Sequence, residues 1–379
     1  MPKPLKILYI EPCPLNFGGY YRSFEICQAL SRQNIKVDLL VSSNSKIFFK
    51  ITKNIINQNL TIYVLPRLYL NFYITGRFLR GIIGTFFGIF GKYDIIHASS
   101  IVQLESNIPL SILKLFGKKT VMSWDDIWTD KTSPFNIHIL KYLKFWENNA
   151  PKFFNNVCCI SQILVNKAKK FGAKNVIKII NGTDPNYFCP AKSHSQKKLK
   201  LNPKFKYLLI FGNSFGSQRA QLILKVFNKI LLLNPKTKLI TNFNPKDFSL
   251  SDNNVVNVGY IPEKLLPYYL AASDAVLFIM GNNLNEKACY PVRIGKFLSS
   301  ESIIIINDNN SETTTVLKKY QCAIIDQDLN TLAQKTVDYF SNTKLQTKLH
   351  SSTIKAKKEL SWDNLVSPLI TLYQDINSR

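Results

Sequence analysis

Short apolar segments of strand length alternate with helix-length segments along most of this chain, and the alternation occurs in two series. The first series begins with the apolar run at 6–10, which leads through a glycine-containing loop into a helical pattern over 21–31. The second begins at 207–211 with the same order of strand, loop and helix. Strands that alternate with helices pair in parallel and are covered by helices on both faces. The sequence therefore predicts an α/β fold with two doubly wound, Rossmann-like domains.

The two series are separated by the stretch 191–206, which reads AKSHSQKKLKLNPKFK and is polar and basic. Such a composition is typical of a linker. At 379 residues, the chain is also longer than a single hydrophobic core usually supports. We therefore expect a first domain at 1–190, a linker at 191–206 and a second domain at 207–360.

The chain carries 49 basic and 24 acidic residues, which gives a net charge of +25. This excess would attract phosphate groups, nucleic acid or an anionic membrane surface. The sequence contains no zinc-finger spacing, RNA-binding sheet signature or arginine stripe, so we expect no nucleic-acid partner. The seven cysteines include no C-x-x-C pair, which predicts neither a disulfide framework nor a zinc site. The apolar run at 5–10 is too short for a signal-peptide core, so we expect a cytoplasmic protein.

An aromatic segment at 67–90 reads RLYLNFYITGRFLRGIIGTFFGIF. Its charges are Arg67, Arg77 and Arg80, and its uncharged part at 81–90 is about half as long as a bilayer-spanning helix. A helix that lies in the membrane interface fits this composition. A helix that is buried against the sheet of its own domain fits it equally well, so both interpretations are open.

Ligands of doubly wound sheets bind beyond the carboxyl ends of the strands, where loops meet helix amino termini. Gly18 and Gly19 follow the first strand, and without side chains their amides can point at an anion. A simple tight turn has the same pattern. Two such sheets that face each other would form a central cleft, where helix dipoles suit a diphosphate.

The run at 180–190, INGTDPNYFCP, resembles the Asn-Gly-x-Asp-x-x-x-Phe-x-Pro turn of the family 4 glycosyltransferases. The likeness extends to Gly18–Gly19, His97, Ser161 and the stretch at 259–306, and it spans nearly the whole chain. It implies the GT-B fold, in which two Rossmann-like domains face a central cleft. The first domain of that fold holds the acceptor, and the second holds a nucleotide-sugar donor.

The resemblance further implies that a sugar is transferred from a nucleotide sugar to a glycan or lipid-linked acceptor. The transfer would retain configuration, would need neither a bound metal nor another cofactor, and would serve synthesis of cell-envelope polysaccharide or glycoconjugates. The positive charge and the aromatic segment add an expected location at the inner face of the cell membrane, in peripheral contact with anionic lipid. Residues 361–379 resemble the closing segment of the family, a helix that packs back on the first domain.

In the first domain, the resemblance places His97 at the carboxyl edge of a strand, facing the cleft. There it would contact the donor or orient the acceptor, and a structural histidine is the alternative. Trp124, Asp125 and Asp126 occupy the place of a motif in which a carboxylate takes the proton of the acceptor hydroxyl and an aromatic ring stacks on a sugar. We select Asp126 as the catalytic candidate and assign Trp124 and Asp125 to the acceptor, with helix capping as the alternative role of the aspartates.

In the second domain, the resemblance assigns Gly212, Asn213 and Arg219 to the donor diphosphate. Asn213 stands where the family usually carries an arginine. Arg219 lies near the expected lysine and would supply the bidentate cation, a catalytic role, that a leaving diphosphate needs. The alternative is a surface arginine at a helix start, but a cation there opposes the helix dipole.

The clearest departure from the family lies at 286–301. Pro291 and Arg293 match the donor-binding pattern, but Lys296 replaces the glutamate that binds the nucleotide ribose in relatives. Lysine cannot accept hydrogen bonds from ribose hydroxyls. Either Glu286 takes over this role, while Arg293 and Lys296 offer positive charge to a phosphate, or catalysis has been lost.

Two alternative functions therefore stay open. The first is a catalytically inactive GT-B homologue that acts as a glycan-binding or assembly partner. The second is a nucleotide-sugar epimerase on the same architecture, because a fold alone does not determine a reaction.

Overall fold

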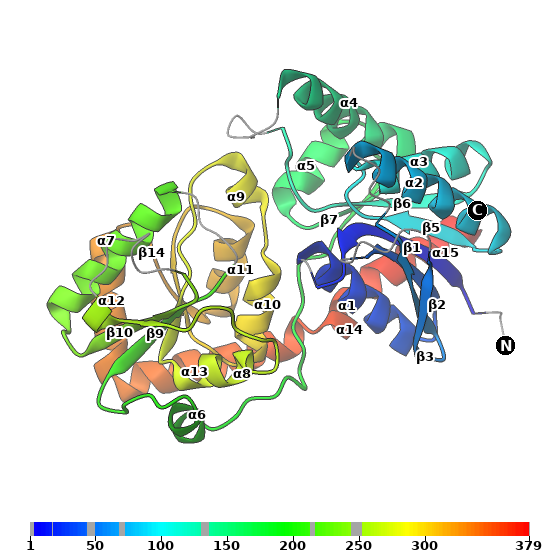
Figure 1. The fold of residues 1–379 in the computed structure, drawn as a ribbon. Helices are drawn as coiled ribbons and strands as arrows, with labels where there is room; N and C mark the ends of the chain where they lie inside the picture. The colour runs from blue at the N-terminus through cyan, green and yellow to red at the C-terminus, as the bar shows by residue number, and fades with distance from the viewer. Residues whose placement is uncertain are drawn as a thin grey trace. The chain divides into compact units, whose positions relative to one another are not determined.

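The computed structural model describes residues 4–16, 18–43, 50–67, 73–129, 136–212, 217–243 and 252–378 of the chain. The chain divides into two compact α/β units, whose elements are labelled in Figure 1. The first unit comprises Met1–Gly182, Ala288–Val292 and Trp362–Arg379, and the second comprises Thr183–Lys287 and Arg293–Ser361. The chain thus leaves the first unit directly after Gly182, within the predicted Asn-Gly turn.

The described residues of the first unit form an eight-stranded sheet with the order β3-β4-β2-β1-β5-β6-β7-β8. Neighbouring strands pair in parallel, except that β3 and β4 are antiparallel. The strands are β1 (Lys6–Pro14), β2 (Lys36–Ser42), β3 (Thr52–Asn57), β4 (Leu60–Leu65), β5 (Ile95–Ala98), β6 (Lys119–Trp124), β7 (Asn156–Cys159) and β8 (Asn175–Lys178). The helices are α1 (Gly18–Arg32), α2 (Tyr73–Phe90), α3 (Leu104–Leu115), α4 (Ile137–Phe154), α5 (Gln162–Lys170), α14 (Trp362–Leu365) and α15 (Ser367–Ser378). The first predicted doubly wound sheet is therefore confirmed.

The hydrophobic core on one face of this sheet contains residues from both the N-terminal and the C-terminal part of the chain. Residues 7–10 of β1 are buried on both faces, which explains why this strand is a continuous apolar run. Ile7 packs in one cluster with Ile26 of α1, and Trp362 and Tyr373 of the C-terminal segment are buried in the same cluster. The segment Trp362–Arg379 therefore completes the core of the first unit.

Helix α2 contains most of the aromatic segment and packs one side against α3. Arg80 is buried there and donates to the Glu105 carboxylate of α3 at 2.7 Å. The opposite side of α2 exposes several aromatic residues. Among the described residues, no helix is both long and apolar enough to cross a membrane.

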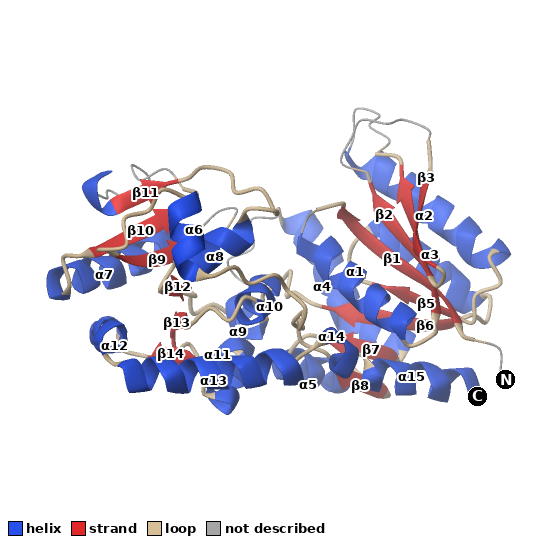
Figure 2. Ribbon diagram, turned by 90° about the horizontal axis from the view of Figure 1, so that it is seen from below, coloured by secondary structure: helices blue, strands red, loops and turns tan. Residues whose placement is uncertain are grey.

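The second unit is built on a parallel sheet in which the described residues supply six strands, in the order β11-β10-β9-β12-β13-β14. The strands are β9 (Lys206–Ile210), β10 (Thr237–Thr241), β11 (Val255–Asn257), β12 (Ala275–Leu277), β13 (Ile304–Asn307) and β14 (Ala323–Asp326). The helices between residues 192 and 359 are α6 (Lys192–Lys198), α7 (Ser217–Leu233), α8 (Leu266–Ala272), α9 (Leu284–Ala288), α10 (Val292–Ser299), α11 (Glu312–Tyr320), α12 (Leu329–Ser341) and α13 (Thr343–Glu359). Figure 2 shows the strands of both sheets with the helices that flank them. The second predicted doubly wound sheet is confirmed as well.

The stretch 191–206, predicted as a linker, is instead part of the second unit. It contains α6, whose Gln196 donates to the Ala272 carbonyl at the end of α8 at 3.2 Å. The Lys198 ammonium lies 3.6 Å from the centre of the Tyr268 ring on the same helix. The stretch is polar because α6 is a short surface helix, so its composition resembles that of a linker although its position is fixed by these contacts.

Candidate functional site

In the first unit, strand β1 leads to the two glycines that open α1. A Cβ atom added to Gly19 would lie 2.7 Å from Cys13 Sγ and 3.1 Å from Glu11 Oε1, whereas one added to Gly18 would meet no atom within 4 Å. The two glycines are therefore not equivalent. A side chain at position 19 would collide with Cys13 and Glu11 at the end of β1, so this position requires glycine. A side chain at position 18 would meet only open space.

Glu11, which we did not predict as a site residue, organises this turn. Its carboxylate is buried and accepts hydrogen bonds from the Cys13 amide at 2.8 Å, from the Ser99 hydroxyl at 2.6 Å and from the Ser23 hydroxyl. Burial raises the pKa of Glu11 above its ordinary value, while the hydroxyl donors oppose that rise. The sequence does contain a hint of this role, because Glu11 is a single acidic residue that follows the apolar run of β1. A carboxylate in such a strand is expected to be buried and to accept hydrogen bonds from nearby groups.

His97 lies one residue before the carboxyl end of β5, but its side chain is enclosed by neighbouring side chains. It is fully buried in β5, beside Tyr9 in the register of the sheet. Its Nε2 atom is hydrogen-bonded to the Ser123 hydroxyl at 2.8 Å, and its Nδ1 atom is hydrogen-bonded to the Tyr373 hydroxyl. Burial, and to a lesser extent the positive charge of Arg22, lower the pKa of His97 to about 3. The structural alternative that the sequence left open therefore describes this histidine.

Trp124 is also buried, and its indole N–H donates to the Asp126 carbonyl at 3.0 Å. The ring is thus part of the core and does not offer a face to a sugar, contrary to the prediction. Asp125 accepts a hydrogen bond from Nε of Arg22 at 3.0 Å, and Arg22 also donates to the Asn181 side chain at 3.0 Å. Since Arg22 is buried, this network ties α1 to the end of β6 and to the Asn-Gly turn.

Asp126 keeps the properties of a candidate proton acceptor. Burial raises its pKa to about 6, the negative charge of Asp125 adds to the rise, and Arg22 opposes it. The residue lines a small cavity together with Ser100 and Trp128. A carboxyl group with a pKa near neutrality is suited to exchange a proton with a bound hydroxyl.

The loop that carries Asp126 is held by Glu147 of α4, another residue that the sequence did not reveal. The buried Glu147 carboxylate accepts hydrogen bonds from the Trp128 amide at 2.5 Å and from the Thr129 hydroxyl at 2.6 Å, and it pairs with Lys167 at 3.0 Å. These contacts fix the backbone that follows β6.

In the second unit, two predicted arginines meet at the carboxyl edge of the sheet. The guanidinium carbons of Arg219 and Arg293 lie 5.8 Å and 5.4 Å from the centre of the same Phe278 ring, which follows β12. Arg293 also donates to the Phe211 carbonyl, at the end of β9, at 2.6 Å. The structure therefore brings together two cations that are far apart in the sequence.

Glu286 belongs to the same group, because its Oε1 atom lies 3.0 Å from a guanidinium nitrogen of Arg219. Its Oε2 atom is buried and has no hydrogen-bond partner among the described residues. A Cβ atom added to Gly281 would lie 2.0 Å from that oxygen, so the glycine leaves room for the carboxylate. Asn309 donates to the Gly281 carbonyl at 2.7 Å, and its own Oδ1 atom is buried without a partner in the described part of the chain. Two unused acceptors thus flank the Gly281 loop.

Other predicted donor residues are engaged elsewhere. Lys296 forms an ion pair with Glu263, so its charge is offset and it does not join Arg293 as a free cation. Gly212 donates its amide to the Asn242 side chain at 3.2 Å, which takes that N–H away from a phosphate. Asn213 lies outside the described residues. Pro291 directly precedes α10 and belongs to the segment Ala288–Val292 of the first unit.

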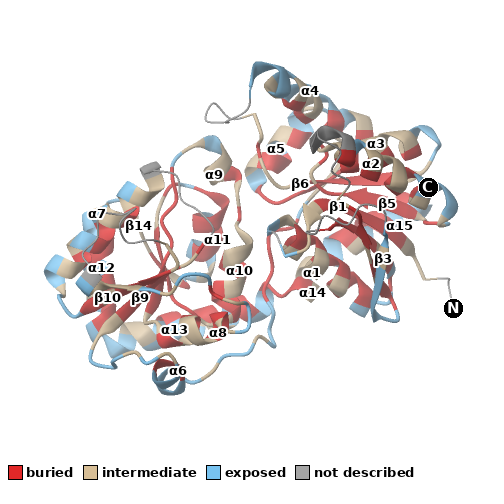
Figure 3. Ribbon diagram, in the orientation of Figure 1, coloured by how far each residue is buried: buried red, intermediate tan, exposed pale blue. Residues whose placement is uncertain are grey.

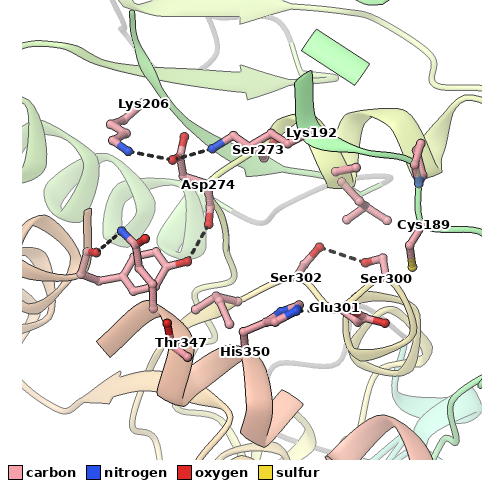
Figure 4. A pocket seen from close by; sticks show the side chains of 16 residues that line it. Cys189, Lys192, Lys206, Ser273, Asp274, Ser300, Glu301, Ser302, Thr347 and His350 are labelled. Atoms are coloured by element: carbon pink, nitrogen blue, oxygen red, sulfur yellow. Dashed lines mark hydrogen bonds and ion pairs between the residues drawn. The ribbon is translucent and has the colours of Figure 1, made fainter. Parts of the chain in front are cut away.

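A separate cavity of about 550 Å³ lies at the amino edge of the second sheet (Figure 4). Asp274 faces it and is paired with Lys192 at 2.7 Å and with Lys206 at 3.2 Å. On the other side, His350 Nε2 lies 3.6 Å from the Glu301 carboxylate. No predicted donor or acceptor residue lines this cavity.

No family model matches the chain, and the search of curated proteins finds no match. Solved structures do match over almost its full length. Sucrose-phosphate synthase from Thermosynechococcus elongatus is 13% identical, with 99% of each chain covered and a TM-score of 0.72. The chain has the GT-B fold.

Two further solved structures match the chain at similar coverage. A structure described as trehalose-6-phosphate from E. coli, bound with UDP-2-fluoro glucose, is 10% identical, covers 99% of each chain and has a TM-score of 0.67. A proposed UDP-N-acetylglucosamine 2-epimerase from Listeria monocytogenes is 9% identical, covers 98% of each chain and has a TM-score of 0.64. At these identities the likeness shows the GT-B fold alone.

Proposed function

We propose that the chain is a glycosyltransferase that moves a sugar from a nucleotide-sugar donor to a hydroxyl of a glycan or lipid-linked acceptor. The observation that carries this proposal is the pair of arginines, Arg219 and Arg293, at the carboxyl edge of the second sheet. In a doubly wound sheet this edge is where ligands bind. Two guanidinium groups there would hold a diphosphate and stabilise the charge that develops as it leaves.

Glu286 supports a donor that carries free hydroxyl groups. Its buried, unused Oε2 atom accepts hydrogen bonds only, as does the Oδ1 atom of Asn309. Because buried acceptors without donors are costly, a ligand that supplies two hydroxyls would satisfy both. A ribose or a hexose fits this requirement, and Glu286 would thereby serve in place of the glutamate that Lys296 replaces.

Asp126 of the first unit is the proposed proton acceptor for the attacking hydroxyl. Its raised pKa of about 6 leaves it mostly ionised at neutral pH and still basic enough to take a proton. Retention of configuration, the absence of a bound metal and a role in cell-envelope polysaccharide or glycoconjugate synthesis complete the proposal, and they follow from the sequence resemblance.

A screen of nucleotide sugars for thermal stabilisation tests the proposal, because a bound donor raises the melting temperature by mass action. Wild type should be stabilised by one class of nucleotide sugar, and Arg219→Ala should lose that stabilisation. Arg32→Ala is the matched control, since Arg32 forms an exposed ion pair with Asp363 in the first unit. No shift with any nucleotide sugar would contradict donor binding.

One specific observation favours the inactive alternative. Lys296 is paired with Glu263, so no carboxylate stands at the position that binds ribose in the family. Incubation of the purified protein with a donor that stabilises it separates the possibilities. Release of the nucleoside diphosphate contradicts the inactive homologue, and turnover that needs no acceptor and leaves the nucleotide-sugar bond intact would favour an epimerase.

A further inference from the structure

The side of α2 that faces α3 is formed by glycines. A Cβ atom added to Gly81 would lie 2.9 Å from the Leu104 carbonyl oxygen, and one added to Gly88 would lie 2.1 Å from Leu113 Cδ1. Between them, Gly84 lies against Pro109 of the same helix. The residue numbers of both helices rise together along this seam. The two helices therefore run parallel and in close contact, and they end on the same side of the first unit.

The bulky residues of α2 point away from this seam. Phe78, Ile82, Phe86 and Ile89 follow one another at intervals of four, four and three residues, which places them on one face of the helix. Phe86 is 54% exposed and Phe90 is 73% exposed, and their rings lie parallel, 6.1 Å apart. Phe78, Phe86, Ile89 and Phe90 are all exposed, so this face of α2 is apolar and open to solvent. Figure 3 colours each described residue of the ribbon by its burial.

The carboxyl end of α3 carries two more exposed apolar side chains. Leu115, the last residue of α3, is 77% exposed and its C-cap Phe116 is 71% exposed, two and three residues beyond Leu113, which meets Gly88 of α2. We define the apolar patch as the outer face of α2 together with Leu115 and Phe116. Scattered exposed apolar residues are ordinary, but several large ones on two helices that pack against each other indicate an interaction surface.

The charged residues within the stretches 77–93 and 106–119 are all positive, because neither stretch contains an aspartate or glutamate. Lys92 follows the end of α2, Lys114 lies in the last turn of α3, and Lys118 follows that helix. Aromatic and leucine side chains with lysines at their margin match the border between acyl chains and anionic headgroups. An acidic protein surface would meet the lysines but would leave the phenylalanine rings without an apolar partner.

We infer that the apolar patch docks the protein on an anionic lipid bilayer, with α2 lying in the interface and the lysines contacting the headgroups. The rings of Phe86 and Phe90 would enter the acyl boundary beside Leu115 and Phe116. This contact belongs to the first unit alone, and it does not depend on the proposed transfer reaction.

Co-sedimentation of the full chain with vesicles tests the inference. The vesicles consist either of an equimolar mixture of phosphatidylglycerol and phosphatidylcholine or of phosphatidylcholine alone. We expect wild type to bind the anionic vesicles at least about tenfold more tightly than the neutral ones, and we expect added salt to weaken that binding. Equal binding to both vesicles, or binding to neither, would overturn the inference.

Two double variants locate the contact. Phe86→Ser with Phe90→Ser, and Leu115→Ser with Phe116→Ser, should each lower binding to the anionic vesicles by about tenfold or more, because each removes apolar area that the bilayer would bury. Leu232→Ser is the matched control, since Leu232 is equally exposed but lies on α7 of the second unit. All of these positions are exposed, so the melting temperatures should stay near that of wild type.

The same variants exclude the competing occupant. If the patch joined two copies of the chain, sedimentation velocity would show a wild-type dimer that dissociates in both double variants, without any vesicle binding. That result would overturn the lipid assignment. Unchanged vesicle binding of both double variants would overturn it equally, and retained nucleotide-sugar stabilisation in these variants would show that the second unit is intact.

Discussion

The guanidinium group of Arg219 and the carboxylate of Glu286 form an ion pair 3.0 Å long at the carboxyl edge of the second sheet. One carboxylate oxygen is used by the arginine, and the other is buried without a partner among the described residues. Arg219 and Arg293 both lie over the Phe278 ring. The two arginines and Glu286 together therefore carry a net positive charge. A phosphate can bind to these cations while a hydroxyl satisfies the carboxylate.

Replacement of Glu286 by glutamine separates two roles of this carboxylate. If it accepts a hydroxyl of the donor, Glu286→Gln loses a charged hydrogen bond, and the affinity for the nucleotide sugar falls by about tenfold or more. Isothermal titration calorimetry measures the change. Tighter binding of the variant would mean that Glu286 only offsets the charge of Arg219.

The two glycines at the start of α1 should respond differently to alanine. Gly19→Ala brings a methyl group to within 2.7 Å of Cys13 Sγ, so we expect it to lower the free energy of unfolding by about 1–3 kcal/mol. Gly18→Ala meets no atom and should change it by less than about 0.5 kcal/mol. Urea unfolding of both variants provides the comparison, and equal effects would contradict the crowding around Gly19.

His97 should act on stability and not on chemistry. His97→Phe leaves the Ser123 and Tyr373 hydroxyls without their ring nitrogens, which should lower the free energy of unfolding by about 2 kcal/mol. Because the pKa of His97 is about 3 in the folded chain, the neutral ring contributes stability that is lost as the pH falls below the ordinary histidine value, and the variant lacks this contribution. Unfolding curves at several pH values measure both effects. A variant that folds well but has lost turnover would restore the catalytic interpretation.

Asp126 should give the opposite pH dependence. Its pKa rises from an ordinary 3.8 to about 6, so the folded chain holds a proton that the unfolded chain releases between these values. The Asp126 carboxyl group therefore contributes stability that is lost as the pH rises from 4 to above 6, and Asp126→Asn lacks that contribution. The free energy of unfolding of the variant relative to wild type should rise by on the order of 2 kcal/mol between pH 4 and pH 8. A difference that stays constant over this range would refute the raised pKa.

The alternation of strands and helices was readable because central parallel strands such as β1 are continuous apolar runs. Strand β3 has no clear signal in the sequence, because it pairs only at the edge of the sheet and exposes nearly all its residues, which leaves TKNIIN without a periodic pattern. The stretch 191–206 was misread for a related reason. A short surface helix and a linker have the same polar composition, and only the contacts of α6 with α8 distinguish them.

Asp126 was selected from a motif that follows β6 closely, and Arg219 from the start of the helix that follows β9. The burial of His97 was not foreseen because it depends in part on Tyr373, which is 276 residues away in the sequence. Lys296 was expected to add positive charge, but it lies in α10 and pairs with Glu263, which lies in the turn before α8. Such pairings depend on tertiary structure and leave no local signal.

The central claim is that Arg219 and Arg293 together hold the diphosphate of the donor. Calorimetric titration with a nucleoside diphosphate tests it most directly, because that ligand carries no sugar that would bind elsewhere. We predict that Arg219→Ala and Arg293→Ala each weaken binding by about tenfold or more, while Arg32→Ala binds as wild type does. Equal affinity in all four proteins would contradict the account.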